Sequence, residues 1–102
     1  MTGEKELVHL CEEIPRVSVI INVHNGETFI ASAIDSVLSQ EFDDFELLVW
    51  DNDSSDQTPS IVRSFVKSDS RVRLIRSNEK TSLYAARNLA LRATSGKLVA
   101  FL

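Results

Sequence analysis

The chain has 102 residues, of which 43 % are hydrophobic and 25 % are charged. This balance is typical of one small globular domain, or of part of a larger one. The formal net charge of −4 argues against a dense basic surface, so we expect no nucleic-acid partner. The single cysteine, Cys11, excludes an internal disulfide, and no apolar run reaches membrane-spanning length. We therefore expect a cytoplasmic protein.

Residues 1–16 form an acidic N-terminal extension with weak patterning. Four residues in it recur at helical spacing, namely Leu7, Leu10, Cys11 and Ile14. This spacing allows a short amphipathic helix that Pro15 would end, but we favour a partly ordered extension. The domain itself is expected to comprise residues 17–102.

Four apolar segments of strand length alternate with amphipathic segments along the rest of the chain. The predicted strands comprise residues 17–23, 45–51, 71–76 and 97–102. The predicted helices comprise residues 27–40, a segment that begins at 58–59, and a segment from 81–82 to about 94. Strands that alternate with crossover helices predict a β-α-β-α-β-α-β chain with a parallel sheet. The fold class is therefore α/β, with a three-layer Rossmann-like sheet.

The polarity of the strands predicts their order in the sheet. The first two are almost continuously apolar, as expected of strands covered on both faces. The third has Val72 and Leu74 on one face and charged residues on the other, which is typical of an edge strand. The predicted order is 3-2-1-4, and we expect Arg71, Arg73 and Arg76 to form a solvated face.

Short polar residues mark the expected helix starts. Asn25, in the turn after the first strand, is a candidate cap for the first helix. Thr58 followed by Pro59 predicts a cap and a proline at the first position of the second helix. Thr81 or Ser82 is the expected cap of the third helix.

The second strand ends in a cluster of polar side chains, which begins with Asp51, Asn52 and Asp53. Ligands bind at the carboxyl ends of the strands in open parallel sheets, so this cluster predicts the floor of a binding pocket. The alternative is that such side chains only stabilise a turn. We interpret Asp53 and Asp56 as residues that organise the loop, and Asp51 and Asn52 as ligand contacts.

Two neighbouring residues also invite a functional interpretation. His24 follows the first strand, and we interpret it as a polar residue that lines the cleft rather than as an acid or base. Trp50 lies within the apolar second strand and is predicted to pack in the core.

Five segments carry a resemblance to a known protein family. They are residues 18–25 (SVIINVHN), 33–40 (AIDSVLSQ), 45–56 (FELLVWDNDSSD), 85–90 (AARNLA) and 96–102 (GKLVAFL). In order and spacing they resemble the motifs of family 2 glycosyltransferases of the GT-A fold. The resemblance covers roughly residues 16–102, and the five motifs together are far more specific than any one alone.

The resemblance implies transfer of a sugar from a nucleoside-diphosphate sugar to an acceptor, in cell-surface polysaccharide or glycoconjugate synthesis. It places the nucleotide-binding residues at Asn22, Val23, Asn25, Asp51, Asn52 and Arg87. Asn22 and Val23 would lie against the base and ribose. Asn52 would pair with the uracil ring, and Arg87 would face the nucleotide from the third helix.

Three positions depart from the frequent family residues. Asn22 replaces a proline, His24 replaces a tyrosine, and Asn52 replaces an aspartate. An amide offers a base both a donor and an acceptor, whereas a carboxylate only accepts. UDP and dTDP carriers therefore both fit the pattern.

The resemblance also implies Mg²⁺ or Mn²⁺, because a divalent cation offsets the charge of the departing diphosphate. The family's D-x-D metal motif is expected immediately after Leu102, and its catalytic base lies further on. This chain therefore supplies no metal ligand and no catalytic residue. We expect residues 17–102 to be the nucleotide-binding half of a truncated GT-A domain, inactive when isolated.

Other functions are less consistent with the sequence. A dinucleotide-binding oxidoreductase needs G-x-G-x-x-G after the first strand, and only Gly26 stands there. The remaining alternative is a non-catalytic nucleotide-binding or self-associating module, since an exposed edge of the fourth strand would favour homo-oligomers. The acceptor is unknown, and a lipid-linked rather than a saccharide acceptor would bring the full-length protein to a membrane.

Overall fold

A computed structural model describes residues 15–96 and 98–102 of the chain. Leu7, Leu10 and Cys11, which suggested an N-terminal helix, lie outside these residues. No helix in the described part is both long and apolar enough to cross a membrane.

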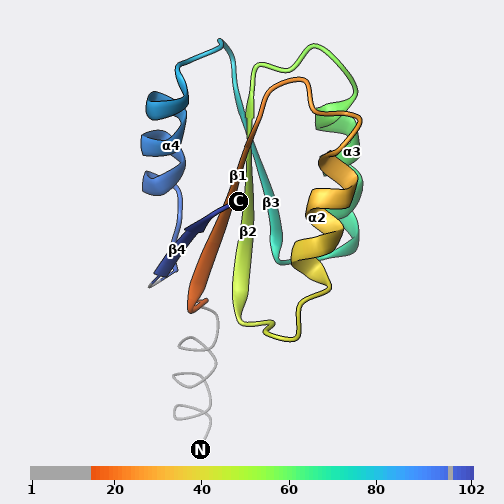
Figure 1. Cartoon of the computed structure of the whole chain (residues 1–102), viewed down its shortest axis with the longest axis vertical. Helices are drawn as coiled ribbons and strands as arrows, with labels where there is room; N and C mark the ends of the chain where they lie inside the picture. The colour runs from red at the N-terminus through yellow and green to blue at the C-terminus, as the bar shows by residue number, and fades with distance from the viewer. Residues whose placement is uncertain (1–14, 97) are drawn as a thin grey trace, which may run out of the picture.

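Four parallel strands form one sheet in the order β3-β2-β1-β4, as predicted (Figure 1). The strands are β1 (Val17–Val23), β2 (Phe45–Asn52), β3 (Val72–Ser77) and β4 (Leu98–Phe101). The helices are α2 (Ile30–Leu38), α3 (Thr58–Ser68) and α4 (Leu83–Arg92). The register places Val23 of β1 beside Asp51 of β2, so the polar ends of these two strands meet.

The helices cover the two faces of the sheet unequally. Helices α2 and α3 lie on one face, and α4 lies on the other (Figure 1). Every residue of β2 is buried, as expected of a strand whose sequence, apart from Glu46, is apolar on both faces until it ends. The three layers confirm the predicted α/β fold class.

Two apolar clusters hold these layers together. On the first face, Ile30, Ile34 and Val62 from the helices pack against the strands. On the second face, Ala86 and Ala90 of α4 pack with a strand set comprising Ile20, Leu48 and Trp50. The small side chains of the two alanines allow α4 to approach the sheet closely. The predicted core position of Trp50 is confirmed, because only 8 % of the residue is exposed.

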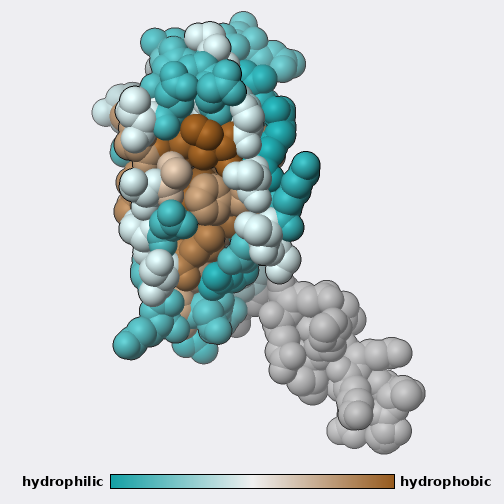
Figure 2. Space-filling view, turned by 90° about the vertical axis from the view of Figure 1, so that its right-hand side faces the viewer, coloured by the Kyte–Doolittle hydropathy of each residue, from teal (hydrophilic) through white to brown (hydrophobic). Residues whose placement is uncertain are grey.

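The outer surface of the two-helix face is partly apolar. Figure 2 shows a hydrophobic band on this face, bordered by polar side chains. Four partly buried residues of α2 and α3 pack against the core there, namely Ala33, Leu38, Ile61 and Phe65. This arrangement is the helical stripe that the sequence predicts, with its outer margin left in contact with solvent.

Two predicted helix caps are wrong. Helix α2 begins at Ile30 with Phe29 as its cap, and Asn25 lies outside it. Asn25 has a φ of 52°, a left-handed conformation incompatible with a helix start. Helix α3 begins at Thr58 with Pro59 in its first turn, within the predicted start, but its cap is Gln57 rather than Thr58.

The third helix starts as expected, because the Ser82 hydroxyl accepts a hydrogen bond from the Ala85 amide at 3.2 Å.

Strand β4 lies at the sheet edge opposite β3 and is exposed along its whole length. Its apolar side chains Leu98 and Phe101 are 62 % and 41 % exposed. The sequence correctly predicts an apolar strand here, while the burial typical of such a strand is not observed.

Candidate functional site

A cavity of about 190 Å³ lies where the carboxyl ends of β1 and β2 meet the start of α4. Its lining residues are Asn22, Val23, His24, Asn52, Lys80, Thr81, Leu83 and Ala86. Three of the six residues predicted to bind nucleotide therefore lie together, namely Asn22, Val23 and Asn52. His24 lines the cleft as predicted. Since open parallel sheets bind ligands at this edge, we take the cavity as the candidate site.

Asn22, which lines this cavity, has a side-chain acceptor without a partner among the described residues. Its Oδ1 atom is buried, and none of the described residues donates a hydrogen bond to it. A buried carbonyl without a partner is costly, so such an atom is typical of a site that a ligand or water completes. The adjacent Val23 is 3 % exposed and gives the cavity an apolar wall.

Asn52 pairs with the loop that follows β3. Its Nδ2 donates to the Thr81 carbonyl oxygen at 2.9 Å, and its Oδ1 accepts from the Thr81 amide at 3.1 Å. The Thr81 hydroxyl donates to the same Oδ1 at 3.1 Å. These three contacts hold the loop against the end of β2.

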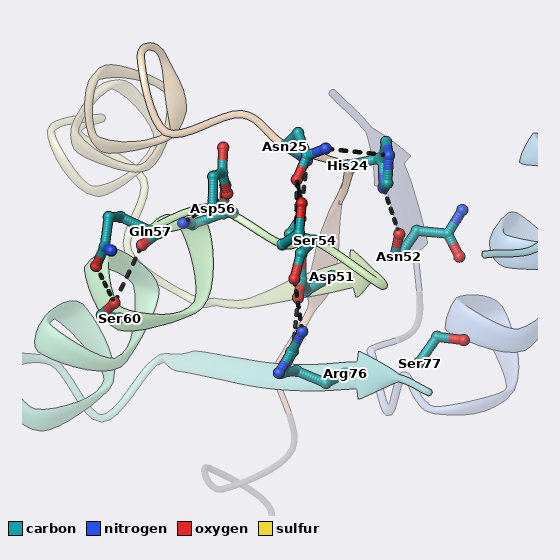
Figure 3. A network of polar contacts seen from close by, with 12 residues as sticks. His24, Asn25, Asp51, Asn52, Ser54, Asp56, Gln57, Ser60, Arg76 and Ser77 are labelled. Atoms are coloured by element: carbon teal, nitrogen blue, oxygen red, sulfur yellow. Dashed lines mark hydrogen bonds and ion pairs between the residues drawn. The ribbon is translucent and has the colours of Figure 1, made fainter. Parts of the chain in front are cut away.

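The loops after β1 and β2 are joined by hydrogen bonds around Asn25 (Figure 3). The Asn25 amide donates to Ser54 Oγ at 2.8 Å, and its side-chain Oδ1 accepts from the Ser55 amide at 2.8 Å. His24 Nδ1 lies 2.7 Å from the Asn52 carbonyl oxygen, so this nitrogen carries a proton and donates it. Asn25 thus connects the loops and lies beside the cavity rather than in its lining.

Gly26 and Asp56 extend the same network toward α3. The Gly26 amide donates to Thr58 Oγ1 at 2.9 Å, and the Thr58 hydroxyl donates to Asp56 at 2.5 Å. A Cβ on Gly26 would lie 2.5 Å from a methyl carbon of Val23, so only glycine allows this approach. Although desolvation raises it, the pKa of Asp56 is lowered overall by hydrogen bonds from Thr58 and Glu27. The predicted loop-organising role of Asp56 is confirmed.

Asp51 is buried and bound on both of its oxygens (Figure 3). Arg76 Nε donates to Oδ2 at 2.8 Å, and the Ser54 hydroxyl donates to Oδ1. Arg76 also donates to the Ser54 carbonyl oxygen at 2.8 Å. The carboxylate therefore fixes the loop after β2 to β3 in this structure.

Arg87 lies away from the cavity, on the exposed surface of α4. Its guanidinium carbon lies 5.2 Å from the centre of the Phe101 ring, which is a cation–π distance. Of the predicted nucleotide-binding residues, this one and the two structural residues Asn25 and Asp51 are not part of the cavity lining.

The solvated arginine face predicted for residues 71–76 is confirmed for Arg73 and Arg76, which are exposed, while Arg71 is half-buried; the prediction did not include the ion pairs that all three form. Each guanidinium binds a carboxylate at 2.8 Å: Arg71 pairs with Asp69, Arg73 with Glu46, and Arg76 with Asp51. The partner acids are close only because of strand register and turns, which charge spacing alone does not reveal.

A second polar cluster, around Glu46, lies near the opposite end of the strands. Glu46 accepts hydrogen bonds from Ser18, from Arg73 at 2.8 Å and from the Ser95 amide at 2.7 Å. Burial alone would raise the pKa of Glu46, but these donors lower it to about 2. The cluster ties the start of β4 to β1 and β2.

A larger, open cavity of about 470 Å³ borders this cluster. Its principal charged groups, Glu46, Arg71 and Arg73, already pair with protein atoms. The smaller cavity is lined by Asn22, whose Oδ1 has no partner among the described residues, and it lies at the edge of the sheet where such folds bind ligands, so it is the better candidate.

Sequence reasoning missed four lining residues: Lys80, Thr81, Leu83 and Ala86. Thr81 was considered only as a helix cap, and the AARN motif drew attention to Arg87 rather than to Ala86. The signal for Glu46 was present, since it is a lone acid in an apolar strand, but its partners come from three different segments.

The residues described here include no group of three or more His, Cys, Asp or Glu that could hold a metal ion. The expected divalent cation therefore has no site among these residues.

Comparison with known proteins decides the family. The family model described as "Glycosyl transferase family 2" matches residues 18–102. The chain belongs to this family.

Two bacterial glycosyltransferases are among the proteins that are similar in sequence to this family-2 chain. The UDP-Glc:alpha-D-GlcNAc-diphosphoundecaprenol beta-1,3-glucosyltransferase WfgD of Escherichia coli is 44 % identical over 86 residues, covering 84 % of this chain and 33 % of that protein. The GalNAc(5)-diNAcBac-PP-undecaprenol beta-1,3-glucosyltransferase of Campylobacter jejuni is 36 % identical over 90 residues, covering 87 % and 29 %. The chain thus spans about a third of their length.

Solved structures confirm the GT-A architecture of the family-2 chain. A mannosyltransferase from Pyrobaculum calidifontis in complex with GDP-Man and Mn²⁺ matches with a TM-score of 0.77 at 26 % identity, covering 96 % of this chain and 34 % of that one. TarS of S. aureus in complex with UDP matches with a TM-score of 0.78 at 29 % identity, covering 85 % and 26 %.

Proposed function

We propose that residues 17–102 are the nucleotide-binding half of a glycosyltransferase that uses a UDP- or dTDP-linked sugar. The proposal places base and ribose in the cavity at the carboxyl ends of β1 and β2. The reaction served would be sugar transfer in cell-surface polysaccharide or glycoconjugate synthesis. The observation that carries it is the cavity that joins Asn22, Val23 and Asn52 at this edge.

The chemistry of the cavity suits a nucleoside. Val23 and Leu83 provide apolar surface for a planar base or a ribose ring, while Asn22 Oδ1 offers an unpartnered acceptor. A ligand that donates an N–H or O–H group to a buried acceptor binds more tightly, because a buried acceptor without a hydrogen bond is costly in free energy. The 190 Å³ volume suits the nucleoside end of a nucleotide better than a whole sugar nucleotide.

The diphosphate and the metal belong outside these residues in this proposal. A divalent ion, Mg²⁺ or Mn²⁺, would bind carboxylates downstream of Leu102, as family membership leads us to expect. We propose that residues 17–102 alone bind nucleotide without transferring sugar. Support for metal use comes from the related mannosyltransferase, whose structure contains Mn²⁺ with GDP-Man.

A lipid-linked acceptor is part of the proposal. The two bacterial relatives named above are glucosyltransferases with diphosphoundecaprenol-linked substrates in their names. The full-length protein would then work in the cytoplasm at a membrane surface. Transfer of radiolabelled glucose from UDP-glucose to an undecaprenol-linked saccharide, by the full-length protein, would test this acceptor class.

Self-association through β4 is a further part of the proposal. The strand is exposed on its outer edge, and the adjoining Leu98 and Phe101 side chains are apolar. Such an edge readily pairs with another strand. A concentration-dependent increase in sedimentation coefficient supports the proposal, and a monomer at every concentration overturns it.

Calorimetric titration of UDP, dTDP, GDP and ADP, each with and without Mn²⁺, tests the proposed site. We expect selective binding of the pyrimidine nucleotides and little effect of Mn²⁺, because the metal ligands are elsewhere. Asn22→Ala should weaken UDP binding by roughly fivefold, since one hydrogen bond to a buried acceptor is lost. The exposed amide residue Gln40, outside the cavity lining, supplies a control, Gln40→Ala, that should bind like the wild type. Equal binding of all four nucleotides by the folded chain would contradict the proposal.

A further inference from the structure

The amide of Asn52 already holds a partner within the chain. Its three hydrogen bonds to Thr81 use the main-chain N–H, the main-chain carbonyl and the hydroxyl of that residue. An amide oxygen accepts about two hydrogen bonds, and an amide nitrogen donates two. Both acceptor positions of Asn52 Oδ1 are therefore occupied, and one N–H of Nδ2 remains.

The main chain of Thr81 presents an N–H and a C=O to Asn52 side by side. A uracil or thymine ring presents the same pair, as its N3–H group and the adjacent carbonyl oxygen. A base and Thr81 cannot both engage the donor and the acceptor of one amide at the same time. The loop after β3 thus occupies the hydrogen-bonding edge that a pyrimidine base would need.

We propose that Thr81 is an internal competitor for Asn52, and that a pyrimidine base binds by displacing the loop between β3 and α4. This inference rests on the proposed nucleotide-binding function. Thr81 then sets the apparent affinity for the nucleotide. Only the molecules in which the loop is released can bind the base, so the apparent affinity falls in proportion to their fraction. Thr81 also favours bases that offer both a donor and an acceptor. A base that forms a single hydrogen bond with Asn52 does not replace the hydrogen bonds that Thr81 loses when it is displaced.

The contacts of the loop are consistent with its release. Asn78, Glu79, Lys80 and Ser82 are exposed. Ser77, the last residue of β3, and Glu79 form two hydrogen bonds with each other at the start of the loop. Among the described residues, the other hydrogen bonds from residues 78–82 to a strand all go to Asn52. A segment with few packed apolar contacts opens at low free-energy cost.

Two substitutions at one position test the competition. Thr81→Val keeps the shape of the side chain but removes the hydroxyl that binds Asn52 Oδ1. We expect it to bind UDP more tightly by roughly three- to tenfold, since the internal partner is weakened by one hydrogen bond. Thr81→Ser restores the hydroxyl and should return the affinity to near that of the wild type. An affinity of Thr81→Val at or below that of the wild type would overturn the inference.

Hydrogen exchange provides the direct readout of displacement. The Thr81 amide is bound to Asn52 in the free chain and should be protected, and saturating UDP should reduce that protection. If UDP binds while the protection of Thr81 is unchanged or rises, the base binds without displacing the loop, and this inference fails while the proposed function stands. If no nucleotide binds either the wild type or Thr81→Val, the proposed function and this inference both fail.

Discussion

Asn25 shows how one residue can fix the geometry of a site that it does not line. It adopts a φ of 52°, a conformation that asparagine tolerates better than most residues. This conformation turns its main-chain amide toward Ser54 and its side chain toward the Ser55 amide. The loops after β1 and β2 are thereby held together beside the cavity.

Two substitutions of Asn25 separate the contribution of its backbone conformation from that of its side-chain hydrogen bond. Asn25→Ala loses the side-chain acceptor and strains the left-handed backbone, so we expect a loss of about 1–3 kcal/mol in the free energy of unfolding. Asn25→Gly loses the same acceptor without the strain, and its loss should be smaller, about 1 kcal/mol or less. Urea denaturation measures both. Equal stability of the two variants would show that backbone conformation contributes nothing there.

The sequence predicted individual residues best where a strand end alone defined their position. Asn22 and Asn52 follow apolar runs, and both line the cavity. The partners Arg76 of Asp51 and Thr81 of Asn52 lie 25 and 29 positions away. These pairings depend on strand register and loop conformation, for which the local sequence has no signal.

Glu46 plays a comparable role at the scale of whole elements. From β2 it contacts Ser18 of β1, Arg73 of β3 and Ser95 in the loop before β4. The neighbouring Gly96 amide donates to Ser18 Oγ at 2.8 Å, and a Cβ there would lie 2.5 Å from that oxygen. One carboxylate therefore connects all four strands, and a glycine is required where the last one approaches.

The pKa of Glu46 makes this connection dependent on pH. The value falls from 4.5 to about 2 in the folded chain, so between these values the unfolded chain binds more protons. Stability from Glu46 is thus complete above about pH 4.5 and is lost as the pH falls toward 2. The contribution is at most about 3 kcal/mol by linkage.

The variant Glu46→Gln tests this linkage. At pH 7 it should unfold more easily by about 1–3 kcal/mol, because an amide cannot accept from all of these donors. The difference in stability between wild type and variant should shrink as the pH falls from 4.5 to 2. Urea denaturation at a series of pH values measures it, and the comparison with the variant cancels the titration of other acids. A difference that is constant with pH would contradict the assigned role.

Element type and order were predictable because periodicity and length carry them. The predicted start and end of β1 match the structure, and β2 runs one residue beyond its predicted end, to Asn52. The start of α2 was not predictable, because the turn at Gly26 delays the helix until Ile30. Glu27, where the predicted helix began, precedes α2, and its main-chain amide donates to Asp56.

In the molecule as a whole, the two ends of the sheet differ in whether their polar side chains are already paired within the chain. Near the amino ends of the strands, the Glu46 cluster satisfies its charges internally. Near the carboxyl ends, Asn22 Oδ1 has no partner among the described residues, and the side chain of Asn52 pairs with Thr81 of a surface loop. The fold and the edge that carries the candidate site were thus predictable from strand polarity, whereas the internal partner of Asn52 required the structure.

Amide chemical-shift mapping with UDP tests the central claim that this edge binds the nucleoside. We predict that UDP shifts the amides of Asn22, Val23, Asn52 and Thr81, and leaves those of Glu46 and Ser95 unchanged. The two sets lie near opposite ends of the strands, so the result locates the ligand without a crystal of the complex. Shifts confined to the Glu46 end, or none at millimolar UDP with the chain shown to be folded, would contradict the account.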